Sequence, residues 1–242
     1  MRKLPVLLLT ALLVLTTCKS GPTHTAEPTT EGPTPPAVTE VPPGEPTMLS
    51  PLPTESPLPT PEPPGGGDEG TGAVLLVIAP EDFRDEEYAE PRAVLEAAGY
   101  AVVVASLSLD VATGMLGMEV QPDLLLADVR VPDYDAIVFI GGNGATVYWD
   151  APEAYRVAQE AAEQGKGLAA ICIAPVILAR AGVLAGREAT VFDPDSLCAE
   201  LEAGGATCTG VPVQRDGRIV TARSPDVAGL FAETIVEVLQ EP

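Results

Sequence analysis

The chain has 242 residues, and 35 Asp and Glu against 13 Lys and Arg give it a net charge of −22. This charge argues against nucleic-acid binding, which needs a clustered cationic surface. His24 is the only histidine, which excludes a metal site built from several histidines, and no cofactor is expected. Hydrophobic residues make up 46% of the chain, yet it holds 26 Pro and 23 Gly, so these averages must combine unlike segments.

Residues 1–18 have the layout of a secretory signal, with a basic start and an apolar stretch too short for a comfortable membrane-spanning helix. The end of this segment, Leu15-Thr16-Thr17-Cys18, resembles the lipobox of bacterial lipoproteins, in which the cysteine is lipidated. Thr17 departs from that pattern, which prefers Gly, Ala or Ser. We expect a lipid anchor at Cys18 and an extracytoplasmic location at the cell membrane. An ordinary cleaved signal and an uncleaved anchor are the alternatives.

Residues 19–72 hold 15 of the 26 prolines, interleaved with Thr, Glu and Gly, and have no apolar periodicity. Such a segment cannot bury enough surface to offset its ordering entropy, and its prolines favour extended conformers. Directly after a lipobox, this composition predicts a disordered spacer that holds a domain away from a membrane. A neutral tail is the alternative, and the Thr-Pro richness also permits O-glycosylation.

Residues 73–242 are expected to form one α/β domain, itself acidic with 27 acidic and 10 basic side chains. The apolar run from Ala73 to Ala79 is typical of a strand buried on both faces of a parallel sheet. Strands then alternate with helices, which predicts a mostly parallel sheet with helices on both faces. Asp150 (with Glu153), Asp193 and Ser224 are expected to cap helices. Further strands are expected at 100–105, 136–140, 167–171, 207–213 and 219–222, and residues 190–192 are expected to be short and extended. Helices are expected at 87–98, 150–164, 175–181, 193–203 and 226–239.

Cys172 follows a predicted strand and precedes a helix that begins within three residues, which is the layout of a nucleophile elbow. Ligand sites in such folds lie at the carboxyl ends of the strands. A cysteine at a helix N-terminus meets the positive end of the helix dipole, which predicts a lowered thiol pKa. A small buried core cysteine is the alternative interpretation.

Two further loops lie at the same predicted edge. The glycine-rich loop at 141–145 can bring backbone N–H groups close to a ligand or an oxyanion. The loop from Phe83 to Tyr88 can direct a carboxylate to Cys172, although an acid-rich helix N-terminus is also ordinary. Cys198 and Cys208 flank a short helix–strand loop, where a disulfide and two independent core residues are both open.

Together these loops resemble the DJ-1/PfpI family of the class I glutamine amidotransferase-like superfamily. The resemblance implies a flavodoxin-like three-layer α/β sandwich with a mostly parallel sheet, usually as a homodimer. It rests on the Phe-x-Asp-x-Glu loop, Gly141-Gly142, the Ala-Ile-Cys elbow, the run from Ile177 to Gly186, and Thr221 to Pro225.

Carried over by position, the resemblance implies that Cys172 is the nucleophile and that Glu87 hydrogen-bonds its sulfur. The backbone N–H groups of Gly142 and Ile173 would form an oxyanion pocket. Protease-like members have His directly after the Cys, where this chain has Ile173. Without a proton shuttle a thiolate cannot readily protonate a leaving amine, so peptidase and amidotransferase activities are not expected.

The remaining Cys–Glu pair predicts chemistry on a small electrophile or an oxidant. One form is glyoxalase-like or deglycase-like addition to a reactive aldehyde such as a 2-oxoaldehyde. The other is oxidation of Cys172, with Glu87 stabilising the product. A non-catalytic binding or display module on the same fold is the alternative.

Overall fold

The computed structural model describes residues 72–241, so the predicted signal, the lipidation site Cys18 and nearly all of the spacer lie outside the described residues. The strands of the central sheet are β1 (Ala73–Val77), β3 (Ala101–Ser106), β6 (Leu124–Leu125), β7 (Ala136–Phe139), β8 (Gly167–Ile171), β11 (Val213–Asp216) and β12 (Ile219–Ala222). They are arranged in the order β11-β12-β8-β7-β1-β3-β6, and every neighbouring pair is parallel except β11 with β12.

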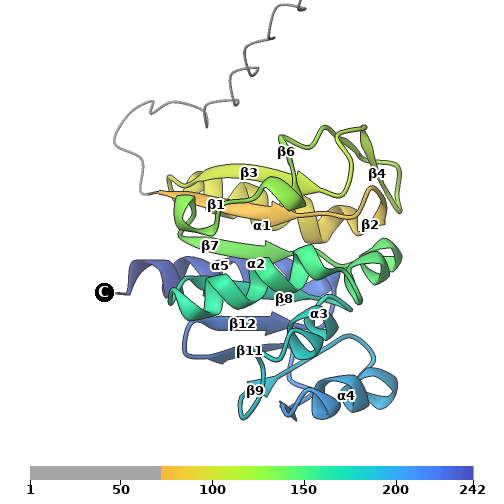
Figure 1. The fold of residues 1–242 in the computed structure, drawn as a ribbon, viewed down its shortest axis with the longest axis vertical. Helices are drawn as coiled ribbons and strands as arrows, with labels where there is room; N and C mark the ends of the chain where they lie inside the picture. Colours follow the sequence, from red (N-terminus) through yellow and green to blue (C-terminus); the bar gives the residue numbers. More distant parts are fainter. Residues whose placement is uncertain (1–71, 242) are drawn as a thin grey trace, which may run out of the picture. The chain divides into compact units, whose positions relative to one another are not determined.

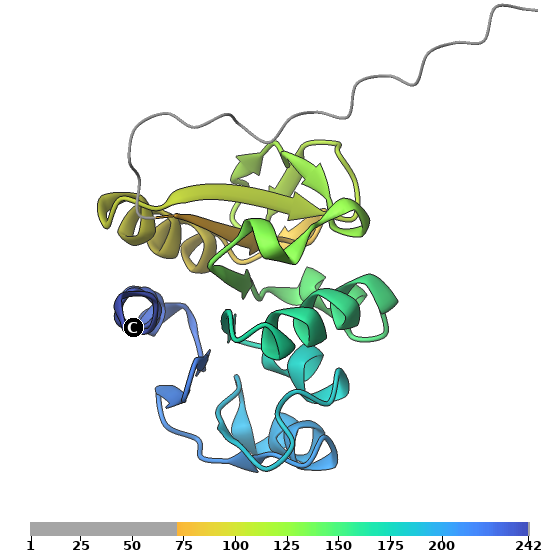
Figure 2. The same cartoon turned by 60° about the vertical axis from the view of Figure 1, so that its left-hand side comes forward.

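Helices cover both faces of this sheet. They are α1 (Asp85–Ala97), α2 (Pro152–Glu163), α3 (Pro175–Arg180), α4 (Pro194–Ala203) and α5 (Ala228–Gln240). Figures 1 and 2 show α1 and α5 on one face and α2 and α3 on the other. The predicted three-layer α/β sandwich with a mostly parallel sheet is confirmed. No helix in this part of the chain is long and apolar enough to span a membrane.

The core lies where the sequence is continuously apolar. Residues Val74 to Val77 of β1 and all of β7 and β8 are buried, as expected for parallel strands covered on both faces. These parallel strands end at the same edge of the sheet. That edge therefore brings together three segments: the residues after β7, the residues after β8 and the start of α1.

Several short strands were not expected from the sequence. A three-stranded sheet joins β2 (Glu81–Phe83), β4 (Ala112–Gly114) and β5 (Glu119–Val120). The buried carboxylate of Asp85 fixes this sheet to the start of α1, because it accepts the N–H groups of Leu116 and Met118, each at 2.8 Å. The hairpin between β4 and β5 is therefore tied to the helix that carries Glu87.

The predicted helix caps were mostly wrong. Helix α2 has Ala151 at its N-cap position, with no side-chain cap hydrogen bond, because the Asp150 carboxylate pairs with Arg180 at 3.1 Å instead. Asp193 is at the N-cap of α4, but its carboxylate accepts the Ser196 hydroxyl rather than a backbone N–H. Ser224 precedes a 3-10 turn, and α5 begins after that turn.

The region between α3 and β11 also differs from the prediction. The structure has a strand just before the extended stretch at 190–192, β9 (Glu188–Ala189), and only the start of 207–213 forms a strand, β10 (Thr207–Cys208), which pairs with β9 in parallel. The extended stretch at 207–213 breaks where Gly210 has a φ of +65° and Pro212 lacks an N–H. We call residues 188–208 the α4 segment. Within it, a disulfide joins Cys198 of α4 to Cys208 of β10, with 5.5 Å between their Cα atoms.

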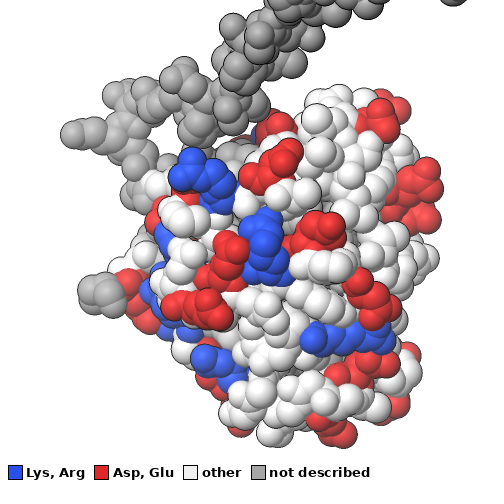
Figure 3. Space-filling view, in the orientation of Figure 1, with Lys and Arg blue, Asp and Glu red and all other residues white. Residues whose placement is uncertain are grey.

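Charged side chains of both signs are interspersed on the face drawn in Figure 3. Arg156 pairs with Glu160 at 3.3 Å, and Arg180 pairs with both Asp150 and Glu200. The basic side chains of this domain are thus largely engaged by its excess of carboxylates.

Replacing both Cys198 and Cys208 with Ser should lower the free energy of unfolding by about 3 kcal/mol. The reason is that the disulfide closes a loop with a sequence separation of 10 in the unfolded chain. Urea unfolding without reductant measures the difference. Wild-type protein unfolded in reductant should match the double variant, which controls for the serine substitutions. Equal unfolding free energies with and without the bond would contradict this account.

Candidate functional site

Cys172 lies directly after β8 at the carboxyl edge of the sheet, with 9% of its surface exposed. Its φ of +63° is in the left-handed region that non-glycine residues rarely adopt. Two backbone hydrogen bonds hold it there. The Cys172 N–H donates to the carbonyl of Ala222 (2.9 Å), and the Phe192 N–H donates to the carbonyl of Cys172 (2.8 Å). The elbow is therefore a strained turn fixed by β12 and by the α4 segment.

Glu87 lies in the first turn of α1 and is fully buried. Its Oε2 accepts the N–H of Gly141 at 3.1 Å. The carboxyl group also interacts with the Cys172 side chain, while Oε1 has no hydrogen-bond partner among the described residues. The structure thus brings Glu87 and Cys172 together, from two elements 85 positions apart in the sequence.

Only glycine fits at position 141. A Cβ there would lie 2.5 Å from the Cβ of Cys172 and 2.6 Å from Oε2 of Glu87. The next residue, Gly142, has a φ of +95°, and a Cβ on it would lie 2.4 Å from the backbone N of Arg84. The glycine pair after β7 therefore allows the loops before α1 and after β8 to approach each other closely.

The backbone N–H groups of Gly142 and Ile173 both donate to the Cys172 sulfur. These are the two groups expected to form an oxyanion pocket. Around the sulfur they favour negative charge, either on a thiolate or on an oxygen that develops charge beside it.

The ionisation of the pair is set mainly by burial. Burial raises the pKa of Glu87 to about 8, although contact with Cys172, the N–H of Gly141 and the charge of Arg84 act in the opposite direction. Burial and the nearby Glu87 raise the pKa of the Cys172 thiol to about 12, against the lowering effect of the two N–H groups. The lowered thiol pKa expected from the helix N-terminus was wrong, because desolvation outweighs the N–H donors. At neutral pH the pair is a carboxylic acid beside a thiol.

The site has no histidine and no metal cluster. Within residues 72–241 no group of three or more His, Cys, Asp or Glu side chains could hold a metal ion. Cys172 is also the one free cysteine of the described residues. The chemistry available here is that of one thiol, one carboxyl group and two backbone donors.

Two aromatic residues beside the elbow were not expected from the sequence. The indole N–H of Trp149 donates to the carbonyl of Ile173 at 3.3 Å. The backbone N–H of Phe192 donates to the carbonyl of Cys172. Phe192 directly precedes the helix-opening Asp193-Pro194, a pattern that places it at the carboxyl edge of an α/β sheet. No comparable signal marks Trp149.

Comparison with known proteins agrees with this geometry. A model of the DJ-1/PfpI family matches residues 73–238. The chain belongs to the DJ-1/PfpI family. A ThiJ/PfpI domain protein from Brachyspira murdochii has a similar structure, with a TM-score of 0.67 and 34% identity over 69% of this chain and 95% of that one.

Relatives of this chain include one uncharacterized protein and two proteins whose names state an activity. It is 41% identical to an uncharacterized protein of Methanocaldococcus jannaschii, over 69% of this chain and 82% of that protein. It is 31% identical to the deglycase PfpI of Pyrococcus furiosus, over 69% of this chain and 99% of that protein. It is 28% identical to the glutathione-independent glyoxalase DJR-1.2 of Caenorhabditis elegans, over 70% of this chain and 90% of that protein.

The raised pKa of Glu87 predicts a loss of stability as the pH rises. Between the ordinary value of 4.5 and the folded value of about 8, the folded protein keeps a proton that the unfolded chain has released. Stability should therefore fall by a few kcal/mol across this window, at about 1.4 kcal/mol per pKa unit. Chemical unfolding at pH 5 and pH 8.5 measures the change.

The neutral variant Glu87→Gln should lose a few kcal/mol less than wild type between these two pH values. Glu90→Gln, at an exposed position on the same helix, should follow the wild-type pH dependence. If wild type and Glu87→Gln have the same pH dependence, Glu87 does not carry a raised pKa.

Proposed function

We propose that the domain is a Cys172-dependent enzyme acting on small electrophiles, with a glyoxalase-like reaction on 2-oxoaldehydes. The observation that carries this proposal is the contact between the buried carboxyl group of Glu87 and a thiol that accepts two backbone N–H groups. A carboxyl group with a pKa of about 8 is suited to proton transfer near neutral pH. Relatives named deglycase and glyoxalase support the same class of chemistry.

The first step in this proposal is addition of the thiol to the aldehyde. Near neutral pH a minor fraction of Glu87 is ionised, because its pKa is about 8. In that fraction the Cys172 sulfur attacks the aldehyde carbon while its proton passes to the Glu87 carboxylate. The carbonyl oxygen becomes an alkoxide, which the N–H groups of Gly142 and Ile173 stabilise. Glu87 then returns the proton to that oxygen, giving a hemithioacetal in a reversible step.

The later steps need no external oxidant or reductant. Glu87 removes the proton from the former aldehyde carbon while the neighbouring ketone oxygen is protonated, giving an enediol. A proton is then returned to the former ketone carbon, and the hydroxyl beside the sulfur loses its proton to become the thioester carbonyl. This converts the hemithioacetal to a thioester of a 2-hydroxy acid. Water then cleaves the thioester and regenerates the thiol, so the net reaction adds one water and oxidises one carbon while it reduces the other.

The same pair also supports a response to oxidants. With peroxide, the sulfur attacks one peroxide oxygen, the O–O bond breaks, and the products are a sulfenic acid and water. Cys–His peptidase chemistry is not part of the proposal, because Ile173 occupies the position after the nucleophile.

A non-catalytic binding module is the second candidate. It is favoured by the burial of Cys172, at 9% exposed, and by the raised pKa of its thiol. A thiol that ionises only at high pH reacts slowly unless a base removes its proton during attack. Glu87 is the group that would supply this base, so activity that depends on Glu87 separates the two candidates.

We further propose that the domain is lipid-anchored through Cys18 on the outer side of a cell membrane, held on the spacer of residues 19–72. The lipobox-like Leu15-Thr16-Thr17-Cys18 and the proline content of the spacer support this. The disulfide between Cys198 and Cys208 is in keeping with an oxidising compartment.

The activity proposal predicts that wild-type protein consumes methylglyoxal and forms lactate. Cys172→Ser should abolish turnover, and Glu87→Gln should lower it by about 10²–10⁴-fold because the proton-transfer group is lost. Glu90→Gln, on the exposed side of the same helix, should retain wild-type turnover. Absence of turnover by the wild type, or equal turnover by wild type and Cys172→Ser, would favour the binding module.

The anchor proposal predicts that the full chain expressed in a bacterium enters the detergent phase of a Triton X-114 extract. Cys18→Ser should move the protein to the aqueous phase, since the acylated residue is lost. Thr17→Ala, which restores the preferred lipobox residue, should leave the protein in the detergent phase. If Cys18→Ser partitions like wild type, the protein is not anchored through this cysteine.

A further inference from the structure

Phe192 is a large, exposed apolar residue whose backbone adjoins that of Cys172. Its backbone N–H donates to the carbonyl of Cys172 at 2.8 Å, so the two residues are adjacent in space. Thr190 and Val191, which precede it, are fully buried, whereas Phe192 is 45% exposed. An aromatic side chain left in solvent next to an elbow cysteine has the position of a substrate-contacting group.

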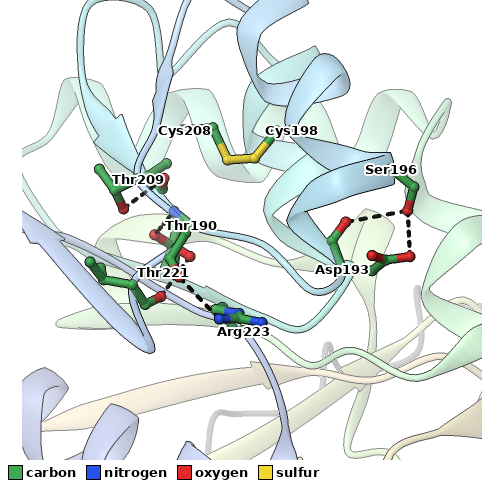
Figure 4. The surroundings of a disulfide bond; sticks show 11 residues. Thr190, Asp193, Ser196, Cys198, Cys208, Thr209, Thr221 and Arg223 are labelled. Carbon is green, nitrogen blue, oxygen red and sulfur yellow. Dashed lines mark hydrogen bonds between the residues drawn. A yellow bond between two sulfur atoms is a disulfide. The ribbon is translucent and has the colours of Figure 1, made fainter.

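Hydrogen bonds of Thr190 and a nearby disulfide fix the segment that carries Phe192. The Thr190 N–H donates to Oγ1 of Thr221 on β12 at 2.9 Å, in a buried contact, and the Thr190 hydroxyl donates to the carbonyl of Val211 at 2.7 Å. Figure 4 shows these threonines beside the disulfide that joins Cys198 to Cys208. The residues just before Phe192 are thus tied to the same strand that positions Cys172.

The residue that follows Cys172 is also apolar. Ile173 is partly exposed, and the Trp149 indole fixes its carbonyl. Two cations lie on the segments around the elbow: Arg84 is paired with Glu86 at 2.8 Å, and Arg223, directly after β12, donates to the carbonyl of Gly210 at 3.1 Å. The domain as a whole has 27 acidic and 10 basic side chains, which disfavours anions.

We infer that Phe192 and Ile173 form an apolar wall beside Cys172 that selects uncharged electrophiles with an apolar or aryl substituent. This inference deepens the proposed function, because it names the substrate class of the same thiol. Phe192 is a specificity-determining residue in this account, and it takes no part in bond making. An aryl group packed against its ring gains about 0.5–1.5 kcal/mol, which corresponds to about 2- to 12-fold in rate.

A test that does not need turnover is alkylation of Cys172 by two reagents, iodoacetamide and N-benzyl iodoacetamide. Rate constants are measured on the folded protein, with mass spectrometry locating the adduct, and the ratio is divided by that for glutathione to remove intrinsic reactivity. Wild type should favour the benzyl reagent by about 2- to 12-fold. Phe192→Ala should bring the corrected ratio close to one, and Phe192→Tyr, which keeps a ring, should restore it.

Leu109→Ala is the matched control. It removes an exposed apolar side chain from the loop after β3, and β3 lies three strands from β8 in the sheet. It should keep the wild-type ratio. A ratio of one in wild type, an unchanged ratio in Phe192→Ala, or a Cys172 that reacts with neither reagent would overturn the inference.

Turnover separates this inference from the proposed function. If methylglyoxal is consumed, wild type should prefer phenylglyoxal through a lower KM, and Phe192→Ala should lose that preference with kcat for methylglyoxal retained. If no aldehyde is consumed but the alkylation ratio depends on Phe192, the catalytic proposal fails while the apolar wall stands. If aldehydes are consumed and neither the alkylation ratio nor the substrate preference depends on Phe192, the inference of an apolar wall is overturned while the catalytic proposal is supported.

Discussion

The buried carboxyl group of Glu87 is the group on which the arrangement of the site depends. It can be buried only because Gly141 supplies an N–H to Oε2 and because no Cβ at position 141 occupies the space beside it. The same absence of a Cβ allows Cys172 to approach the carboxyl group from the neighbouring strand. Three sheet-edge segments, after β7, after β8 and at the start of α1, must therefore keep a fixed separation for the pair to exist. The parallel strands β7 and β8 provide that fixed geometry.

Burial and hydrogen bonding act in opposite directions on this pair. Desolvation favours the neutral acid and the neutral thiol, whereas the N–H groups of Gly142 and Ile173 favour charge on the sulfur. A thiol in this state is protected from adventitious reaction but remains next to a base that titrates near neutral pH. In the proposed reaction, the proton leaves the sulfur only as the new bond to carbon forms. This accounts for a reactive role without a histidine.

The parts of the fold that are encoded locally could be predicted from the sequence. Continuous apolar runs identified β1 and β8, and the change from strand to helix around Cys172 identified the elbow. Shorter elements could not be found this way, because strands of two or three residues such as β2 and β5 are too short to show an alternation of apolar and polar residues. The prediction that Asp150 caps α2 was wrong because Arg180, distant in sequence, pairs with the Asp150 carboxylate. The predicted direction of the Cys172 pKa shift was wrong for a similar reason. The helix dipole is a local effect, whereas burial is a property of the whole domain.

The most direct test of the central claim is a ¹³C NMR titration of the Glu87 side-chain carboxyl in the folded protein, with the signal assigned by its loss in Glu87→Gln. The account predicts a titration midpoint of about 8. A midpoint near the ordinary value of 4.5 would show that Glu87 is a carboxylate throughout the neutral range, and would contradict a site built on a protonated acid beside a thiol.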